Sequence, residues 1–167
     1  MDIINKVASS SLVTIDLEQW LLPADQIIGF DIKNYLLHEF VLQEKPFREA
    51  LKQHDWQPYS QMNVGLHCSN DAIVPRWAYM LVCTYLQPRA KKIVFGDLER
   101  VQHILLDEHI EGIDFEVYKG KKVVVKGCSN LPISTSAYIK ITQCLLPFAQ
   151  SMMYGEPCST VPIFKKL

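Results

Sequence analysis

Three cysteines, each followed by a serine, are the residues of this chain best suited to chemistry: Cys68, Cys128 and Cys158. Two acids, Asp97 and Glu156, each follow an aromatic residue and a glycine. Thiolates and carboxylates are ligands that zinc accepts, and three cysteines also suit an iron–sulfur cluster. The five residues therefore form the predicted metal site, which would hold zinc or an iron–sulfur cluster.

The same residues leave two further interpretations open. The chain has no Cys-x-x-Cys pair, so only its fold can bring the sulfurs together. A cysteine at a helix N-terminus has a lowered pKa, so a thiolate-dependent enzyme or sulfur carrier is one alternative, with the acids and Arg76 holding its substrate. Free cysteine also packs as a small apolar residue, so the other alternative is a structural or partner-binding protein without catalysis. No catalytic residue is identified.

A doubled pattern surrounds these cysteines. The triplets Cys68-Ser69-Asn70 and Cys128-Ser129-Asn130 each follow a short apolar run and precede an apolar stretch of helical period. When the two triplets are aligned, the number of residues between the asparagine and the following Ala-Tyr pair differs by one between the copies. Each copy predicts a strand, a turn, a helix and a strand. Their serines and asparagines are also good candidates for capping the helices that follow.

These elements predict an α/β fold with a mostly parallel sheet built from two similar units. The first unit spans 61–98, the second spans 121–160, and a β/α extension over 1–60 precedes them, all within a single domain over 1–167. Residues that follow parallel strands lie at one edge of the sheet, so we expect the five candidate ligands to share that edge. The expected helices are Phe47–His54, Pro75–Gln87, Asp97–Gly112 and Ser134–Leu146, and the expected N-terminal strands are Leu12–Leu17 and Ile27–Ile32. We expect residues 156–162 to form an ordered loop.

Composition excludes several classes of protein. The 167 residues carry a net charge of −1, which gives no general attraction to nucleic acid or to a membrane surface. Neither a signal peptide nor a transmembrane stretch is visible, so we expect a cytoplasmic protein whose cysteines are reduced. Glycine-rich phosphate motifs are absent, so no nucleotide cofactor is expected. The motifs of serine hydrolases and zinc peptidases are absent too.

Several distinctive stretches together resemble one known family. The chain is similar to the bacterial family called domain of unknown function 2480, over nearly its whole length. This resemblance implies a cytosolic bacterial protein, and it implies iron–sulfur assembly proteins as partners, without implying a reaction or a substrate. The stretches that carry it are Phe30–Lys33, Cys68–Tyr79, Val94–Glu99, Lys126–Ser129 and Gly155–Pro162.

Overall fold

The computed structural model describes residues 12–127, 131–156 and 159–166. Helices and strands alternate along the chain and most neighbouring strands are parallel, which confirms the predicted α/β class. The chain divides into two compact units. Unit 2 is the continuous segment Leu22–Ile104, whereas unit 1 combines the residues up to Leu21 with Leu105–Leu167.

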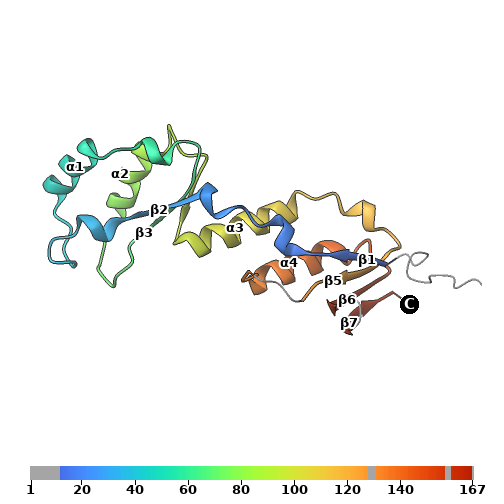
Figure 1. The fold of residues 1–167 in the computed structure, drawn as a ribbon. Coiled ribbons are helices and arrows are strands. Elements are labelled where there is room, and N and C mark those ends of the chain that lie inside the picture. Colours follow the sequence, from blue (N-terminus) through green and yellow to red (C-terminus); the bar gives the residue numbers. More distant parts are fainter. Residues whose placement is uncertain (1–11, 128–130, 157–158, 167) are drawn as a thin grey trace, which may run out of the picture. The chain divides into compact units, whose positions relative to one another are not determined.

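Unit 2 contains a three-stranded parallel sheet (Figure 1). Its strands, in spatial order, are β2 (Ile27–Asp31), β3 (Asn63–His67) and β4 (Lys92–Phe95). The helices α1 (Glu44–Gln53) and α2 (Arg76–Leu86) are amphipathic, and their buried residues form a core with Phe30 and Val64 of the sheet. Arg48 of α1 lies over the ring of Trp77 in α2, at 5.6 Å from its centre.

On the other face of this sheet, glycines allow a helix to pack close to the strands. Gly29 of β2 and Gly65 of β3 are partners across the two strands. A Cβ atom on Gly65 would lie 2.7 Å from the carbonyl oxygen of Gly96 and 3.1 Å from Val101. The first turns of α3 (Leu98–Glu111) therefore pass directly over the middle strand.

Unit 1 contains a four-stranded sheet in which the first three strands are parallel and the last is antiparallel. Its core combines the second half of α3, through Leu106 and Ile110, with α4 (Thr135–Leu145) and the sheet. Ser134 caps α4, because its side chain accepts a hydrogen bond from the backbone N–H of Ala137 at 3.2 Å. In spatial order the strands are β1 (Leu12–Ile15), β5 (Lys122–Val125), β6 (Ser151–Glu156) and β7 (Ser159–Lys165).

The two units share a strand–helix–strand arrangement with constant spacing. Its three elements begin at residues 63, 76 and 92 in unit 2 and at 122, 135 and 151 in unit 1, a constant difference of 59. Buried residues also recur at this difference of 59; Ala78 and Ala137, for example, are both buried. We call positions that differ by 59 equivalent. Cys68 is then equivalent to Gly127, not to Cys128, so the alignment on the Cys-Ser-Asn triplets is wrong by one residue.

Four short 3₁₀ turns share another pattern, in which an aspartate precedes an apolar residue and an aromatic follows three positions later. In each turn the aspartate accepts a hydrogen bond from the backbone N–H two residues on, at 2.9–3.1 Å. The apolar residue is buried in every case. The four aspartates are Asp16, Asp31, Asp55 and Asp114.

Two expectations about the sheet are wrong. The strands form two sheets rather than one, because the N-terminal strands β1 and β2 pair in different units. Residues 159–165 form the strand β7, although the segment from residue 156 to 162 was expected to be an ordered loop. Pro162 lies in this strand, which is an edge strand, the position where proline is tolerated. The prediction of a single domain stays a prediction.

Candidate functional site

The carboxyl edge of the unit 2 sheet holds the best described set of polar side chains. Asp31 ends β2 and lies opposite His67, which ends β3. The Asp31 carboxylate accepts hydrogen bonds from the backbone N–H groups of Lys33 at 2.9 Å and Ser69 at 3.0 Å. Asp31 therefore connects the end of β2 to the loop that follows β3.

Burial raises the pKa of Asp31, but hydrogen bonds from Ser69 and Lys33 and the charge of His67 outweigh it and hold the pKa below the ordinary 3.8. The His67 Nε2 atom lies 3.9 Å from the Asp31 carboxylate. Its Nδ1 atom is 3.4 Å from the carbonyl oxygen of Gly65. This edge consequently holds a fixed carboxylate next to a histidine.

Cys68 follows β3 and is half-buried. Its Sγ donates a hydrogen bond to Oδ1 of Asn70 at 3.3 Å, and the same Oδ1 accepts the backbone N–H of Ala72 at 3.2 Å. The Asn70 amide also donates to the carbonyl oxygen of Glu39. Asn70 therefore shapes the loop and does not cap a helix, because α2 begins only at Arg76.

Cys68 and Asp31 both influence Tyr79, which lies on α2. Burial, followed by the charges of Cys68 and Asp31, raises the pKa of the Tyr79 hydroxyl. The alternative in which Cys68 acts as a nucleophile stays a prediction.

The predicted metal ligands fall in different parts of the fold. Cys68 and Asp97 follow the adjacent strands β3 and β4 in unit 2, whereas Glu156 ends β6 in unit 1. Cys128 and Cys158 lie outside the described residues. Within the described part of the chain, no three histidine, cysteine or acidic side chains are grouped as metal ligands. The metal site therefore stays a prediction.

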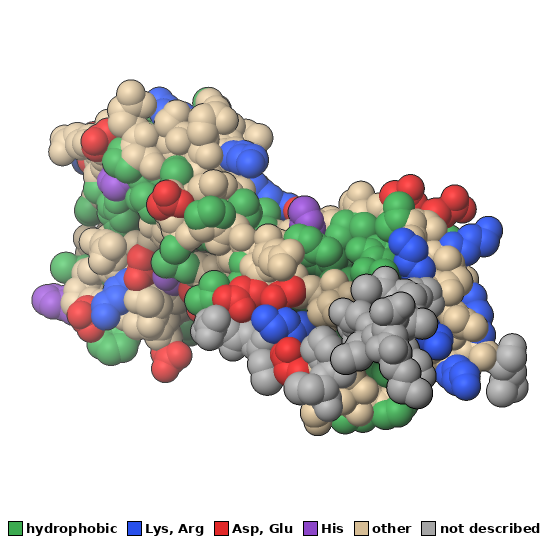
Figure 2. All heavy atoms as spheres, turned by 45° about the vertical axis from the view of Figure 1, so that its right-hand side comes forward, with side chains coloured by type: hydrophobic (Ala, Val, Ile, Leu, Met, Phe, Trp, Pro, Cys, Tyr) green, Lys and Arg blue, Asp and Glu red, His purple; other side chains and the backbone are tan. Residues whose placement is uncertain are grey.

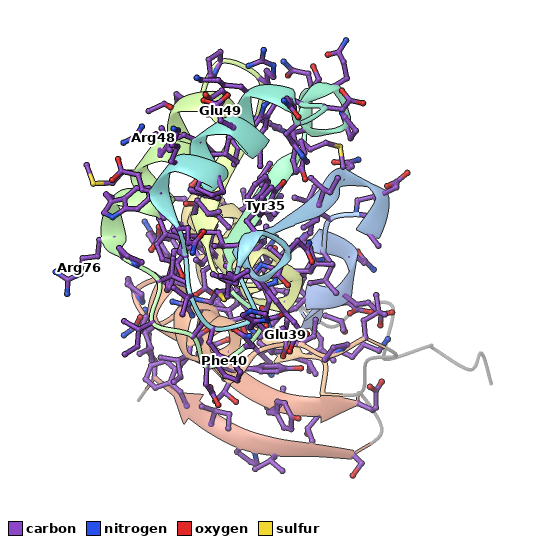
Figure 3. All side chains as sticks on the ribbon, turned by 90° about the vertical axis from the view of Figure 1, so that its left-hand side faces the viewer. Tyr35, Glu39, Phe40, Arg48, Glu49 and Arg76 are labelled. Atoms are coloured by element: carbon purple, nitrogen blue, oxygen red, sulfur yellow. The ribbon has the colours of Figure 1, made fainter. Side chains whose placement is uncertain are left out.

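Arg76 and Asp97, which were expected near a bound substrate, have other surroundings. Arg76 is the first residue of α2 and is exposed, and Figure 3 shows its side chain pointing away from the ribbon. The Asp97 carboxylate accepts the backbone N–H of Arg100 at 2.8 Å, in the first turn of α3. Asp97 thereby stabilises the start of that helix.

The carboxyl edge of the unit 1 sheet carries a different charge pair. The Lys126 ammonium donates to Asp16 at 2.8 Å, and this hydrogen bond, together with the charges of Asp16 and Glu156, raises the pKa of the lysine. One carboxylate oxygen of Glu156 is buried and has no hydrogen-bond partner among the described residues. Lys126 is equivalent to His67, so both sheets pair an aspartate with a basic residue at this edge.

An apolar groove lies beside β4 in unit 2. Its volume is about 710 Å³. Elsewhere on the surface, hydrophobic side chains likewise lie among charges of both signs, as the face drawn in Figure 2 shows. Two of the groove's lining side chains are largely exposed: Met80 at 69% and Phe95 at 73%. The groove is lined by Leu66, Tyr79, Met80, Cys83, Thr84, Gln87, Pro88, Ile93 and Phe95.

The equivalent place in unit 1 is closed by β7. A cavity of about 140 Å³ remains there, lined by Val125, Tyr138 and Thr142, which are equivalent to Leu66, Tyr79 and Cys83 of the groove. Ile163 of β7 also lines it. Within the described residues, β4 pairs only with β3, so unit 2 has no strand in the position of β7.

The sequence prediction missed both Asp31 and the groove. The aspartate was detectable, because the pattern of an aspartate, an apolar residue and a later aromatic recurs four times. The groove was not detectable, because its walls come from a strand and a helix whose contact depends on strand order.

The described helices include none with the length and apolar character needed to cross a membrane. Neither the curated proteins nor the solved structures contain a significant match to the chain. A family model described as "Protein of unknown function (DUF2480)" matches residues 1–166. Because that match covers nearly the whole sequence, the chain belongs to the DUF2480 family.

Proposed function

We propose that the chain is a partner-binding protein that holds an extended, apolar protein segment in the groove between α2 and β4. The groove carries this proposal, because it joins an open apolar volume of about 710 Å³ to a strand edge. Among the described strands β4 lies at the edge of its sheet. An edge strand can add a further strand through its backbone N–H and C=O groups, and an adjacent pocket selects side chains of the added strand.

Unit 1 supports this type of ligand. There, β7 pairs antiparallel with β6 and places Ile163 against the residues equivalent to the groove. The same arrangement of helix and strands therefore accepts an antiparallel strand with an apolar side chain. Exposed apolar surface such as that of Met80 and Phe95 commonly marks an interaction site in soluble proteins.

Site-specific photo-cross-linking of the full chain tests the proposal. A photoreactive phenylalanine analogue replaces Met80, which lines the groove, or Ile139, its equivalent in unit 1. Ile139 is 56% exposed on α4 and does not line the unit 1 cavity, so it is a matched control. In the cells that produce the protein, we expect a defined cross-linked product from position 80 that is much stronger than any from position 139.

The additional substitution Phe95→Asp should remove that product, because it places a charge in the groove. Mass spectrometry of the product should locate the cross-link in an extended apolar segment. Equal labelling from positions 80 and 139, or a product that Phe95→Asp leaves unchanged, would show that the groove does not bind a protein segment.

A metal site is a second proposal, favoured by the position of Cys68 and Asp97 after adjacent strands of one sheet. The proposed ligands are Cys68, Cys128 and Cys158, with Asp97 or Glu156, holding zinc or an iron–sulfur cluster in a cytosolic protein. Anaerobic purification followed by zinc, iron and sulfide analysis tests it. Stoichiometric metal that is lost in the triple Cys→Ala variant is the expected result, and a metal-free wild-type protein contradicts it.

A further inference from the structure

We infer that the segment bound in the groove is acidic at one end: an apolar side chain lies opposite Ile93, and an aspartate or glutamate lies two positions later, opposite Lys91. This inference rests on the proposed function and gives the chemistry of the partner. The acidic end lies where β4 begins and where Pro88 follows α2.

The backbone at the start of β4 matches that of unit 1, so unit 1 gives the register of an added strand. Lys91 donates its backbone N–H to the carbonyl oxygen of Met62 at 2.9 Å, and its equivalent Gln150 donates to Lys121 at 2.8 Å. The carbonyl oxygen of Gln150 accepts the backbone N–H of Lys166 at 2.8 Å, which continues the pairing of β6 with β7. A strand added to β4 in this register therefore places one residue opposite Lys91, as Lys166 lies opposite Gln150.

The same register brings an apolar side chain to the groove. Met152, the equivalent of Ile93, pairs with Phe164, which packs against the core of unit 1. Phe164 precedes Lys166 by two positions, so their side chains lie on the same face of the strand. In unit 2 the added strand consequently places an apolar residue opposite Ile93, which lines the groove, and its next residue on that face opposite Lys91.

The positive charges at this end are on opposite partners in the two units. In unit 1 the added strand carries Lys166, while the positions that receive it hold the uncharged Phe148 and Gln150. In unit 2 the equivalent receiving positions hold Arg89 and Lys91, both of them exposed. Opposite charges on facing residues stabilise a strand pair, whereas like charges destabilise it. The receiving strand of unit 2 therefore favours an acidic residue where β7 has a lysine.

Arg89 also replaces the function that Lys166 has in unit 1. There, the Lys166 ammonium donates to the carbonyl oxygen of Pro147, just after the end of α4, at 2.8 Å. In unit 2 the Arg89 guanidinium donates to the carbonyl oxygen of Tyr85, in the last turn of α2, at 2.9 Å. Carbonyl groups at a helix C-terminus favour a cation, and α2 already has one from its own chain. The added strand thus needs no lysine at this place.

The substitution Lys91→Glu tests this inference in the full chain that carries the photoreactive residue at position 80. We expect much less of the cross-linked product, because the reversal turns an attraction between facing residues into a repulsion. Lys119→Glu, at an exposed lysine of unit 1, is the matched control and should leave the product unchanged. Since Lys91 is exposed, the circular dichroism spectrum of Lys91→Glu should match the wild type.

A labelled synthetic peptide of the cross-linked segment then gives the affinity by fluorescence anisotropy with the purified full chain. We expect Lys91→Glu to raise the dissociation constant about 10-fold. Replacing the acidic residue of the peptide by lysine should weaken binding to the wild type and restore binding to Lys91→Glu. This exchange of charges separates a direct pairing from a general effect of the substitution.

A cross-linked segment without an acidic residue two positions after its apolar residue, from this chain or another protein, overturns the inference. Equal affinities of the wild type and Lys91→Glu overturn it too. The proposed function fails separately, when position 80 gives no product that depends on Phe95. A product that Phe95→Asp removes and Lys91→Glu leaves unchanged supports the bound segment but excludes its acidic end.

Discussion

Asp31 shows how one carboxylate can organise a strand end. It accepts two backbone N–H groups, from Lys33 and Ser69, and its pKa lies below its ordinary value. A lowered carboxyl pKa means that the unfolded chain binds the proton more readily. The stability from Asp31 is thus present above pH 3.8, the ordinary pKa, and is lost as the pH falls through the folded-state pKa.

Asp31→Ala should therefore reduce the free energy of unfolding by about 1–2 kcal/mol, the usual cost of losing such a capping side chain. Asp31→Asn should cost less, because its amide oxygen still accepts hydrogen bonds. Asp55→Ala is the matched control, since Asp55 is exposed and, among the described residues, accepts one hydrogen bond, from the backbone N–H of Gln57. Urea unfolding at neutral pH measures all three, and an equal loss from Asp31→Ala and Asp55→Ala would contradict the role of the second bond.

His54 is a half-buried histidine whose surroundings oppose protonation. Its Nδ1 lies 2.9 Å from the Tyr35 hydroxyl, its ring packs against Trp56, and its Nε2 has no partner among the described residues. Burial lowers the pKa of His54 below 6.5, although the charge of Asp55 opposes that effect. The unfolded chain consequently binds a proton at a higher pH than the folded chain does.

We expect stability to be highest above pH 6.5 and to fall as the pH decreases toward the folded-state pKa of His54. Replacing the histidine by glutamine should flatten this dependence. His103 of α3, whose Nε2 lies 3.7 Å from the Glu99 carboxylate, is half-buried like His54 and provides the control substitution His103→Gln. Urea midpoints between about pH 5 and 7 give the slopes, and an unchanged slope in His54→Gln would show that other groups cause it.

At the scale of elements, Gly65 controls how closely α3 approaches the unit 2 sheet. A Cβ there would lie 2.7 Å from the backbone of Gly96, whereas a Cβ on its strand partner Gly29 would meet ordinary contacts at 3.4 Å and beyond. Gly65→Ala should cost about 1–3 kcal/mol through overpacking, and Gly29→Ala much less. Thermal unfolding compares the two variants, and similar melting temperatures would disprove the close approach.

The helices were predictable because each is amphipathic or follows a clear boundary residue. Ser134, the first residue of the expected helix Ser134–Leu146, caps α4, and α2 ends at Leu86, just before Pro88. The strand β7 was missed because Pro162 and its neighbours resemble a loop, and only its pairing with β6 makes it a strand. Local sequence determines which segments become helices, but strand partners depend on contacts that are distant in sequence.

The candidate site was less predictable than the elements. Cys68 does follow a strand, as expected, yet the doubled triplet suggested that Cys128 is its counterpart. The constant spacing of the elements makes Gly127 the counterpart instead. Matching the two Cys-Ser-Asn triplets requires a gap of one residue and pairs Cys68 with Cys128. The boundaries of the helices and strands require no gap and pair Cys68 with Gly127.

At the scale of the whole molecule, the two units differ in how the chain builds them. Unit 2 is continuous, and all three of its strands and its core lie between Leu22 and Ile104. We expect a fragment of residues 22–104 to unfold cooperatively in urea, with a circular dichroism spectrum of a mixed α/β protein. A broad transition without a baseline for the folded state would show that unit 2 needs the remainder of the chain.

Unit 1 has the opposite character, since β1 comes from the beginning of the chain and pairs with β5. Asp16 and Lys126, which join these two strand ends, are 110 positions apart. On the ribosome, β1 therefore emerges long before its partner is synthesised, while the whole of unit 2 is translated between them. A nascent chain released early would carry a folded unit 2 and an unpaired β1, so protein synthesis itself imposes an order in which the enclosed unit is completed first.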